Sequence, residues 1–80
     1  MSDVNTLLDA AFQETNLLEN GEVFLVRDLF KGYEWNRISR KDRLLLGTLF
    51  LNRVNNEHGF IKVALKTSSG QQRYQITKEV

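Results

Sequence analysis

The sequence predicts an α+β protein, and more specifically a winged helix-turn-helix: three helices, a small three-stranded antiparallel sheet and a C-terminal β-hairpin that forms the wing. Two observations lead to this fold class. Apolar residues recur at helical spacing near the start and in the middle of the chain, and apolar and polar residues alternate in its last quarter. A chain of 80 residues has the length of one domain, which we place over residues 1–80.

The first predicted helix runs from Asp3 to Leu18. Its apolar residues follow one another at helical spacing: Val4, Leu7, Leu8, Ala11 and Phe12. Asn20 and Gly21 then break the helix, because both residue types tolerate the left-handed conformation that is common just after a helix.

A short strand and a short helix are expected next. Residues 22–26 are rich in the β-formers Val and Phe and predict a strand, which can pair with the hairpin. Residues 27–31 predict the second helix, which Gly32 stops, and residues 33–38 then form a connection.

The third predicted helix runs from Arg40 to Asn55. Ser39 is a strong N-cap candidate, and Asp42 three positions later gives a pattern similar to a capping box. A helical wheel separates two faces. The face expected in the core carries Leu46, Phe50 and Val54. The outward polar stripe carries Lys41, Thr48, Asn52 and Asn55.

Two features of this helix are unusual. Leu44 and Leu45 flank the narrow polar stripe, so they either lie under the first two helices or border an apolar groove. Gly47 inside a helix costs roughly 1 kcal/mol relative to Ala, so we expect it to permit the close approach of another helix.

The hairpin is predicted from Gly59 to Thr77. Ile61, Val63 and Leu65 alternate with polar or small residues, which predicts a half-buried strand, and residues 67–70 form the turn. The returning strand covers residues 72–77 and places Gln72, Tyr74 and Ile76 on one face.

Charge is distributed unevenly along the chain. All eleven Lys and Arg residues follow residue 26, whereas five of the ten acidic residues precede it. Such asymmetry suggests a surface for a polyanion. Four of the cations crowd the start of the third helix: Arg37, Arg40, Lys41 and Arg43. A helix N-terminus disfavours cations, so this cluster is best explained by phosphate groups that approach the same place, or else by a solvated basic turn.

Further candidate binding residues lie in the wing and beside the helix-turn-helix. Lys62, Lys66 and Arg73 would give the hairpin a basic outer surface. Tyr33 and Trp35, interleaved with basic residues, could stack on the bases of single-stranded nucleic acid or line a pocket. The alternative for Trp35 is a place in the core.

Nothing in the sequence indicates catalysis. There is no Cys, His58 is the single His, and no residue spacing resembles a metal site or a phosphate-binding loop. We therefore expect no enzyme activity and no cofactor. No run of about 18 apolar residues and no signal-peptide pattern is present, so we expect no membrane partner and a cytoplasmic location.

Three sequence runs resemble a known family. They are F-L-V-x-D-L-F-x-G-Y-x-W-x-x-I (residues 24–38), R-L-x-L-G-x-x-F (residues 43–50) and K-T-S-S-G-Q-Q-x-Y (residues 66–74). Together they are similar to small winged-helix single-stranded DNA-binding proteins of Gram-positive mobile elements, of the staphylococcal cassette chromosome type, once grouped as a domain of unknown function. The resemblance implies a winged-helix fold, a single-stranded DNA ligand and an apolar pocket.

The residues and the resemblance together favour a non-enzymatic single-stranded DNA-binding protein that serves replication, repair or transfer of a mobile element. Two alternatives stay open. A double-stranded DNA-binding transcription regulator would use Thr48 and Asn52 to contact bases and would bind as a dimer. A protein-interaction or inhibitor module would use Leu44, Leu45 and Trp35 as a partner groove, with self-association as one form of it.

Overall fold

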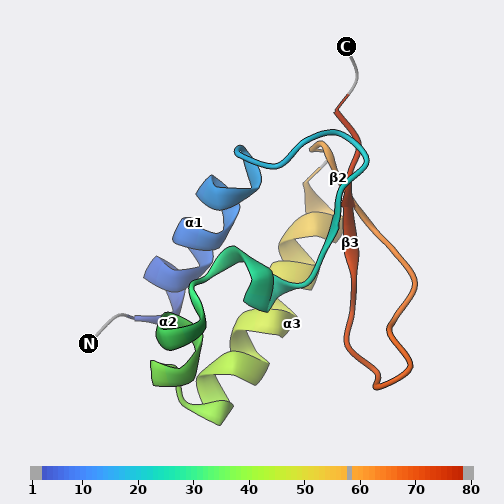
Figure 1. Ribbon diagram of the computed structural model, residues 1–80. Helices are drawn as coiled ribbons and strands as arrows, with labels where there is room; N and C mark the ends of the chain where they lie inside the picture. The colour runs from blue at the N-terminus through green and yellow to red at the C-terminus, as the bar shows by residue number, and fades with distance from the viewer. Residues whose placement is uncertain (1–2, 58, 79–80) are drawn as a thin grey trace.

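The computed structural model describes residues 3–57 and 59–78 and shows an α+β architecture (Figure 1). In chain order, the elements are α1 (Val4–Thr15), β1 (Val23–Phe24), the 3₁₀ helix η1 (Val26–Leu29), α2 (Gly32–Arg37), α3 (Arg40–Asn56), β2 (Ile61–Val63) and β3 (Tyr74–Ile76). The predicted class, with three α-helices and a three-stranded antiparallel sheet, is confirmed. No helix in residues 3–57 and 59–78 is long and apolar enough to cross a membrane.

The sheet has the order β1-β3-β2, so the last strand lies in the middle. Val23 pairs with Gln75 on one side of β3, and Ile61 pairs with Ile76 on the other, both antiparallel. The strand after α1 therefore pairs with the hairpin, as predicted. In Figure 1 the helices occupy one side of the molecule and the sheet the other, with residues 64–73, called the β2–β3 loop below, extending beyond the strands.

The core lies between α1, α3 and the sheet. Phe50 of α3 is its centre: the ring stacks on Phe12 of α1 at 4.4 Å between centroids and contacts Tyr74 of β3 at 4.8 Å. Leu46 and Ile76 are fully buried beside it. The predicted inward face of α3 is thus confirmed, and so is the inward face of β3 at Tyr74 and Ile76.

The first helix is shorter than predicted, because it ends at Thr15 instead of Leu18. The Thr15 hydroxyl donates to the Phe12 carbonyl at 2.5 Å, and the chain then turns. Leu17 is 77% exposed and contributes nothing that would prolong the helix. Gly21 does adopt a left-handed conformation, with φ of 89°, but it lies in the next turn, where its N–H donates to the Ile76 carbonyl at 2.7 Å.

The prediction for residues 27–38 was wrong. Residues 26–29 form only a 3₁₀ turn, and Gly32 begins α2 instead of stopping a helix. Phe30 is extended and ends the 3₁₀ turn. The Glu34 carboxylate then accepts a hydrogen bond from the Lys31 N–H at 3.1 Å, which stabilises a new helix start inside the segment predicted as a connection.

The start of α3 is as predicted. The Ser39 hydroxyl accepts a hydrogen bond from the Asp42 N–H at 3.2 Å, and the helix runs one residue past the predicted end, to Asn56. The turn predicted for residues 56–59 includes His58, which lies outside the described residues.

The β2–β3 loop departs from the predicted alternation. Ile61 is half-buried, but Val63 is 39% and Leu65 is 81% exposed, so the second half of the predicted strand does not face the core. The paired strand ends at Val63, and beyond it both backbone and side-chain hydrogen bonds hold the loop: the Ala64 N–H donates to the Arg73 carbonyl and the Thr67 N–H to the Gln71 carbonyl, each at 2.8 Å. Gln72 donates to the Ala64 carbonyl, and Arg73 donates to the Leu65 carbonyl at 2.7 Å.

Candidate nucleic-acid interface

A groove of about 390 Å³ opens between α3, the β2–β3 loop and the segment that joins β1 to η1. Helix α3 contributes Leu44, Gly47, Thr48 and Leu51 to its walls. The β2–β3 loop contributes Lys66, Gly70, Gln71 and Gln72. Leu25, Val26, Arg27, Trp35, Arg43 and Tyr74 complete the lining. Most of this surface is apolar, and its charged residues within the described chain are all cations, namely Arg27, Arg43 and Lys66.

Gly47 has a different role from the predicted one. A Cβ atom at this position would meet no atom within 4 Å, so the glycine does not permit the close approach of another helix. It lines the groove, and its missing side chain keeps that part of the groove open. No protein contact therefore offsets the roughly 1 kcal/mol that Gly costs inside a helix.

Two aromatic residues also line the groove. Tyr74 is 1% exposed, and burial raises the pKa of its hydroxyl to about 12, so the hydroxyl stays protonated at neutral pH. Trp35 is half-buried and packs against Phe30 with ring centroids 5.9 Å apart. The two predictions for Trp35, a place in the core and a place lining a pocket, are therefore each confirmed in part, because it packs against the core and also borders the groove.

The predicted cations at the start of α3 divide into two kinds. Arg40 and Lys41 are exposed, and neither forms an ion pair with any described residue. Arg43 folds back on the turn between α2 and α3: its Nε donates to the Ile38 carbonyl at 2.9 Å and its Nη2 to the Asn36 carbonyl at 3.3 Å. The Arg43 guanidinium also lies 5.5 Å from the Trp35 ring. Its first task is thus structural, and a phosphate contact stays a prediction.

Tyr33 lies outside the groove. Its side chain is 54% exposed on α2, between the Arg37 guanidinium at 4.9 Å and the Lys31 ammonium at 5.9 Å from the ring centroid. An exposed ring between two cations is suited to stacking on a base, whereas Trp35 has the position suited to a pocket. The structure therefore separates two residues that the sequence grouped together.

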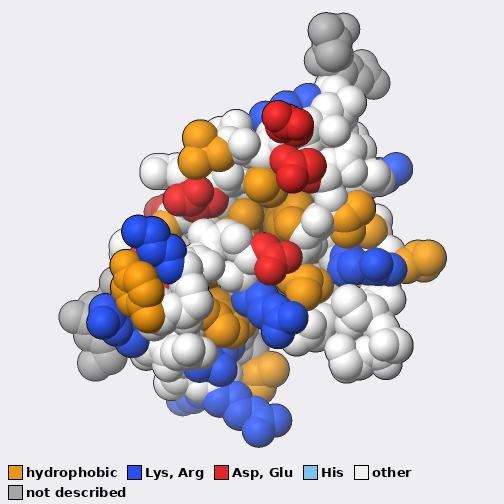
Figure 2. Space-filling view, viewed as in Figure 1, with side chains coloured by type: hydrophobic (Ala, Val, Ile, Leu, Met, Phe, Trp, Pro, Cys, Tyr) orange, Lys and Arg blue, Asp and Glu red, His pale blue; other side chains and the backbone are white. Residues whose placement is uncertain are grey.

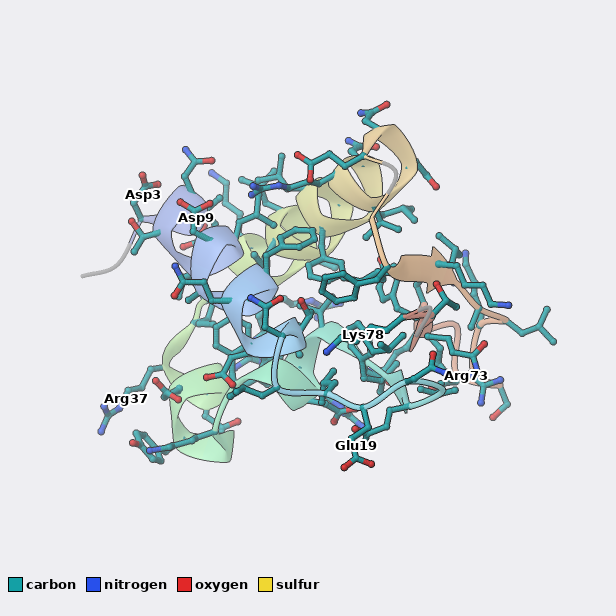
Figure 3. The ribbon with its side chains drawn as sticks, turned by 90° about the horizontal axis from the view of Figure 1, so that it is seen from above. Asp3, Asp9, Glu19, Arg37, Arg73 and Lys78 are labelled. Atoms are coloured by element: carbon teal, nitrogen blue, oxygen red, sulfur yellow. The ribbon has the colours of Figure 1, made fainter. Side chains whose placement is uncertain are left out.

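The cations of the hairpin lie on the other side of the groove. Lys62 and Lys66 are exposed, and Arg73 is half-buried. Figure 3 places Arg37 and Arg73 at opposite ends of the molecule. In Figure 2, Lys and Arg side chains gather over α2 and the start of α3, while Asp and Glu side chains lie mostly nearer the connection between α1 and β1. The predicted binding cations thus form two groups that flank the groove.

Sequence reasoning missed Arg27, which lines the groove opposite the β2–β3 loop. No local pattern marks it in the sequence, where it is one residue of a predicted short helix, because its place beside the groove follows from the tertiary fold. The structure also decides between the two alternatives for Leu44 and Leu45. Leu44 is 65% and Leu45 is 44% exposed, so the first two helices do not cover them.

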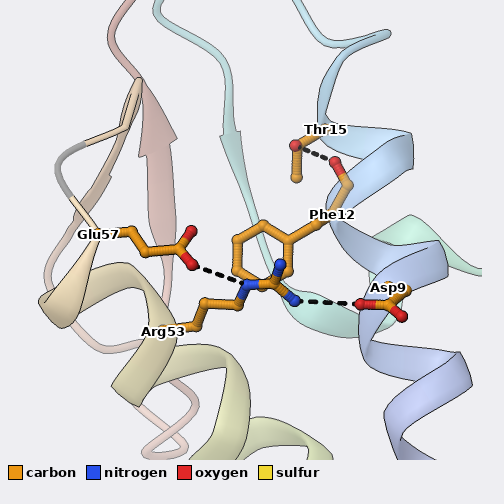
Figure 4. Close-up of polar contacts among 5 residues, drawn as sticks. All are labelled: Asp9, Phe12, Thr15, Arg53 and Glu57. Carbon is orange, nitrogen blue, oxygen red and sulfur yellow. Dashed lines mark hydrogen bonds and ion pairs between the residues drawn. The ribbon is translucent and has the colours of Figure 1, made fainter.

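One cation of α3 is committed to the fold. Arg53 donates from Nη1 to Asp9 at 3.2 Å and from Nε to Glu57 at 3.3 Å, and its guanidinium lies 4.6 Å from the Phe12 ring (Figure 4). The hydrogen bond with Asp9 raises the pKa of Arg53 above its usual value, so this group stays charged. Arg53 joins α1 to α3 and does not line the groove.

A comparison with known families gives one match. The model of a family described as a domain of unknown function, DUF1413, matches residues 9–75. No curated protein and no solved structure matched the chain. The matched residues include the groove and nearly all of the fold around it, and on this basis the chain belongs to the DUF1413 family.

Proposed function

We propose that this protein is a non-enzymatic single-stranded DNA-binding protein with a winged-helix fold, in which the β2–β3 hairpin is the wing. The observation that carries the proposal is the groove between α3 and the hairpin: its lining is apolar, and its charged residues, Arg27, Arg43 and Lys66, are all cations. An apolar surface bordered only by cations is suited to a ligand with flat apolar groups on an anionic backbone.

The surface of α3 favours a single strand over a duplex. A helix that reads the major groove offers polar side chains to the base edges. Here Leu44 and Leu45 are exposed beside the polar stripe, and burying them requires apolar partners. Unpaired bases provide such partners, because their faces are free to pack on apolar and aromatic side chains.

The two groups of cations supply the backbone contacts in this proposal. At one end, phosphates would be held by Arg37, Arg40 and Lys41. Tyr33 on α2 would be the stacking platform at that end. Lys62, Lys66 and Arg73 would hold phosphates at the other end, and the strand would cross the groove between the two groups. Such binding weakens with salt, because each phosphate contact releases counterions.

The resemblance of residues 24–38, 43–50 and 66–74 to winged-helix single-stranded DNA-binding proteins of Gram-positive mobile elements supports the same proposal. By that resemblance the protein would act in replication, repair or transfer of such an element, in the cytoplasm. The resemblance does not identify the residues that contact DNA, and those named above rest on their charge and their positions around the groove.

Fluorescence anisotropy with a labelled oligo(dT) and with a duplex of equal length tests the proposal. We expect tighter binding to the single strand, with log K falling against log salt by about 0.7 for each phosphate contacted. Preference for the duplex would instead support a transcription regulator. Binding that is absent, or that does not change with salt, would contradict the proposal.

A second candidate function is a protein-interaction module. The exposed Leu44, Leu45 and Leu65 favour it, because large apolar side chains exposed on a small domain are common where a partner binds. Its partner could be a second copy of the chain. Concentration-dependent association in sedimentation velocity, lost in Leu65→Ser while oligo(dT) binding persists, would establish this candidate separately, because Leu65 does not line the groove.

A further inference from the structure

We infer that the groove over Gly47 holds one unpaired nucleobase, whose carbonyl-bearing edge accepts hydrogen bonds from Tyr74 and Trp35. This inference rests on the proposed function and makes it more specific, because it assigns a base pocket and a preference among the bases. Three properties of the groove support a base there: its open space, its hydrogen-bond donors and the charges at its rim.

The open space is built into the helix. Gly47 is an interior residue of α3, where Ala would stabilise the helix by roughly 1 kcal/mol. A Cβ atom there would point into empty space, so packing within the protein does not account for the glycine. The groove volume of about 390 Å³ is within the range of about 300–1,000 Å³ that is typical of small-molecule pockets. A flat ligand group lying over Gly47 uses the space that a side chain would fill.

The hydrogen-bonding groups of the groove are mainly donors. No hydrogen bond among residues 3–57 and 59–78 involves the Tyr74 hydroxyl or the Trp35 indole N–H. No fully buried side-chain nitrogen or oxygen there lacks a partner, so neither donor is completely enclosed, although the Tyr74 side chain is only 1% exposed and Trp35 is half-buried. The tryptophan N–H can only donate, and the tyrosine hydroxyl, which is protonated at neutral pH, can donate as well as accept.

Two other polar side chains of the groove already donate within the protein, whereas the side chains of Arg27, Lys66 and Gln71 form no hydrogen bond with a described residue. The Thr48 hydroxyl donates to the Leu44 carbonyl at 3.1 Å, and the Gln72 amide nitrogen donates to the carbonyls of Ala64 and Arg73. A ligand edge with carbonyl acceptors therefore fits the groove best. Thymine carries two carbonyls, O2 and O4, whereas adenine carries an amino donor in place of a carbonyl. The geometry thus favours thymine over adenine.

Charge at the rim fits a nucleotide and not a neutral ligand. Arg27 comes from η1 and Lys66 from the β2–β3 loop, so cations stand on two sides of the same apolar floor. Phosphates on either side of one base would meet these two side chains while the base itself enters the groove. An acidic peptide is the other ligand with this charge, but it carries no bases, so weaker binding of an oligomer without bases would favour the nucleotide.

The test compares three oligonucleotides of equal length and equal phosphate number: oligo(dT), oligo(dA) and an oligomer made of abasic sites. We expect anisotropy titrations at about 100 mM salt to show the abasic oligomer bound at least about 10-fold more weakly than oligo(dT), since stacking of bases is lost. Oligo(dA) is expected between the two. Equal affinity for oligo(dT) and the abasic oligomer would overturn the inference.

Gly47→Leu and Asn55→Leu form a matched pair of variants. Both add the same side chain to α3, but Gly47 lines the groove and Asn55 is exposed outside it. Gly47→Leu is expected to weaken oligo(dT) binding about 10-fold and to leave abasic binding unchanged, and Asn55→Leu to change neither. Circular dichroism and thermal unfolding check that both variants fold. Unchanged oligo(dT) binding by a folded Gly47→Leu would contradict the inference.

Tyr74→Phe tests the donor separately, because it keeps the ring in the core and removes only the hydroxyl. We expect the ratio of oligo(dT) to oligo(dA) affinity to fall by about threefold or more while abasic binding stays the same. An unchanged ratio would contradict the carbonyl-edge assignment. If the wild-type protein bound no single strand at all, the proposed function would fail together with this inference. If it bound all three oligomers equally, only the base pocket would fail.

Discussion

The two ends of α3 use their cations in opposite ways. At the C-terminal end, Arg53 forms ion pairs with Asp9 and Glu57 and packs over the Phe12 ring, so it joins two helices. At the N-terminal end, Arg40 and Lys41 are exposed and form no ion pair with any described residue. Both ends belong to one helix of 17 residues, so the difference lies in the surroundings and not in the element.

The helix dipole sharpens this difference. A cation in the last turn is favoured by the partial negative charge there, and a cation in the first turn is disfavoured, each by about 0.3–1 kcal/mol. Arg53 therefore gains from its position, while Arg40 and Lys41 lose. The fold accounts for the position of Arg53, whereas the proposed phosphate contacts would account for the unfavourable positions of Arg40 and Lys41.

The largest expected effect separates the two ends directly. Arg40→Gln/Lys41→Gln should weaken oligo(dT) binding by about 10- to 50-fold at 50 mM salt, and should make the salt slope shallower by about 1.4, if each cation holds one phosphate. The same change should leave the free energy of unfolding equal or slightly higher, because two unfavourable dipole interactions disappear. Anisotropy titrations and urea unfolding measure the two quantities.

A matched control variant has the same net charge as Arg40→Gln/Lys41→Gln. Asn5→Asp/Gln13→Glu lowers the net charge by the same two units at exposed positions of α1. It should reduce binding only slightly, through the general field of the protein. An equal loss of affinity in both double variants would show that net charge matters and the start of α3 does not.

The second expected effect concerns the other end. Arg53→Met keeps an apolar chain over Phe12 but removes both ion pairs and the cation, so we expect a loss of about 1–2 kcal/mol in the free energy of unfolding. DNA affinity should hardly change. A double-mutant cycle with Asp9→Asn should give a coupling of about 0.5 kcal/mol, since both side chains are partly exposed. If the Arg53→Met variant folded but lost much of its DNA affinity, the two ends of α3 would no longer differ in how they use their cations.

The sequence predicted the parts of the fold that depend on local periodicity. The inward face of α3, the Ser39 cap and the buried residues of β3 all follow from spacing along the chain, and all are confirmed. The predicted secondary structure of residues 27–38 was wrong, because the two short helices there contain too few residues to display the spacing of apolar residues that marks a helix. The prediction that the half-buried strand reaches Leu65 was wrong, because alternation of apolar and polar residues does not show where strand pairing stops.

The candidate site was predictable only in part, for similar reasons. Cations near a helix start can be read from the sequence, so Arg40 and Lys41 could be named as candidates, and their role in binding stays a prediction. Gly47 could not be assigned, because an open space above a glycine and a closely packed neighbour look identical in a sequence. Arg27 comes to the groove through a pairing between strands about 50 residues apart, which no local pattern encodes.

The smallest expected effects come from the residue that begins α3. Ser39→Ala removes the acceptor for the Asp42 N–H and should lower the free energy of unfolding by about 1 kcal/mol. Ser39→Asp keeps an N-cap acceptor and adds a favourable negative charge, so stability should be preserved or raised.

The DNA-binding result should run the other way. Ser39→Asp places an anion beside Arg40 and Lys41 and should weaken oligo(dT) binding about 2- to 5-fold, whereas Ser39→Ala should leave it nearly unchanged. Stability and affinity would then move in opposite directions at one position. If Ser39→Asp raised both, the cations at the start of α3 would be part of a solvated basic turn, and the contrast between the two ends of the helix would carry no information about a ligand.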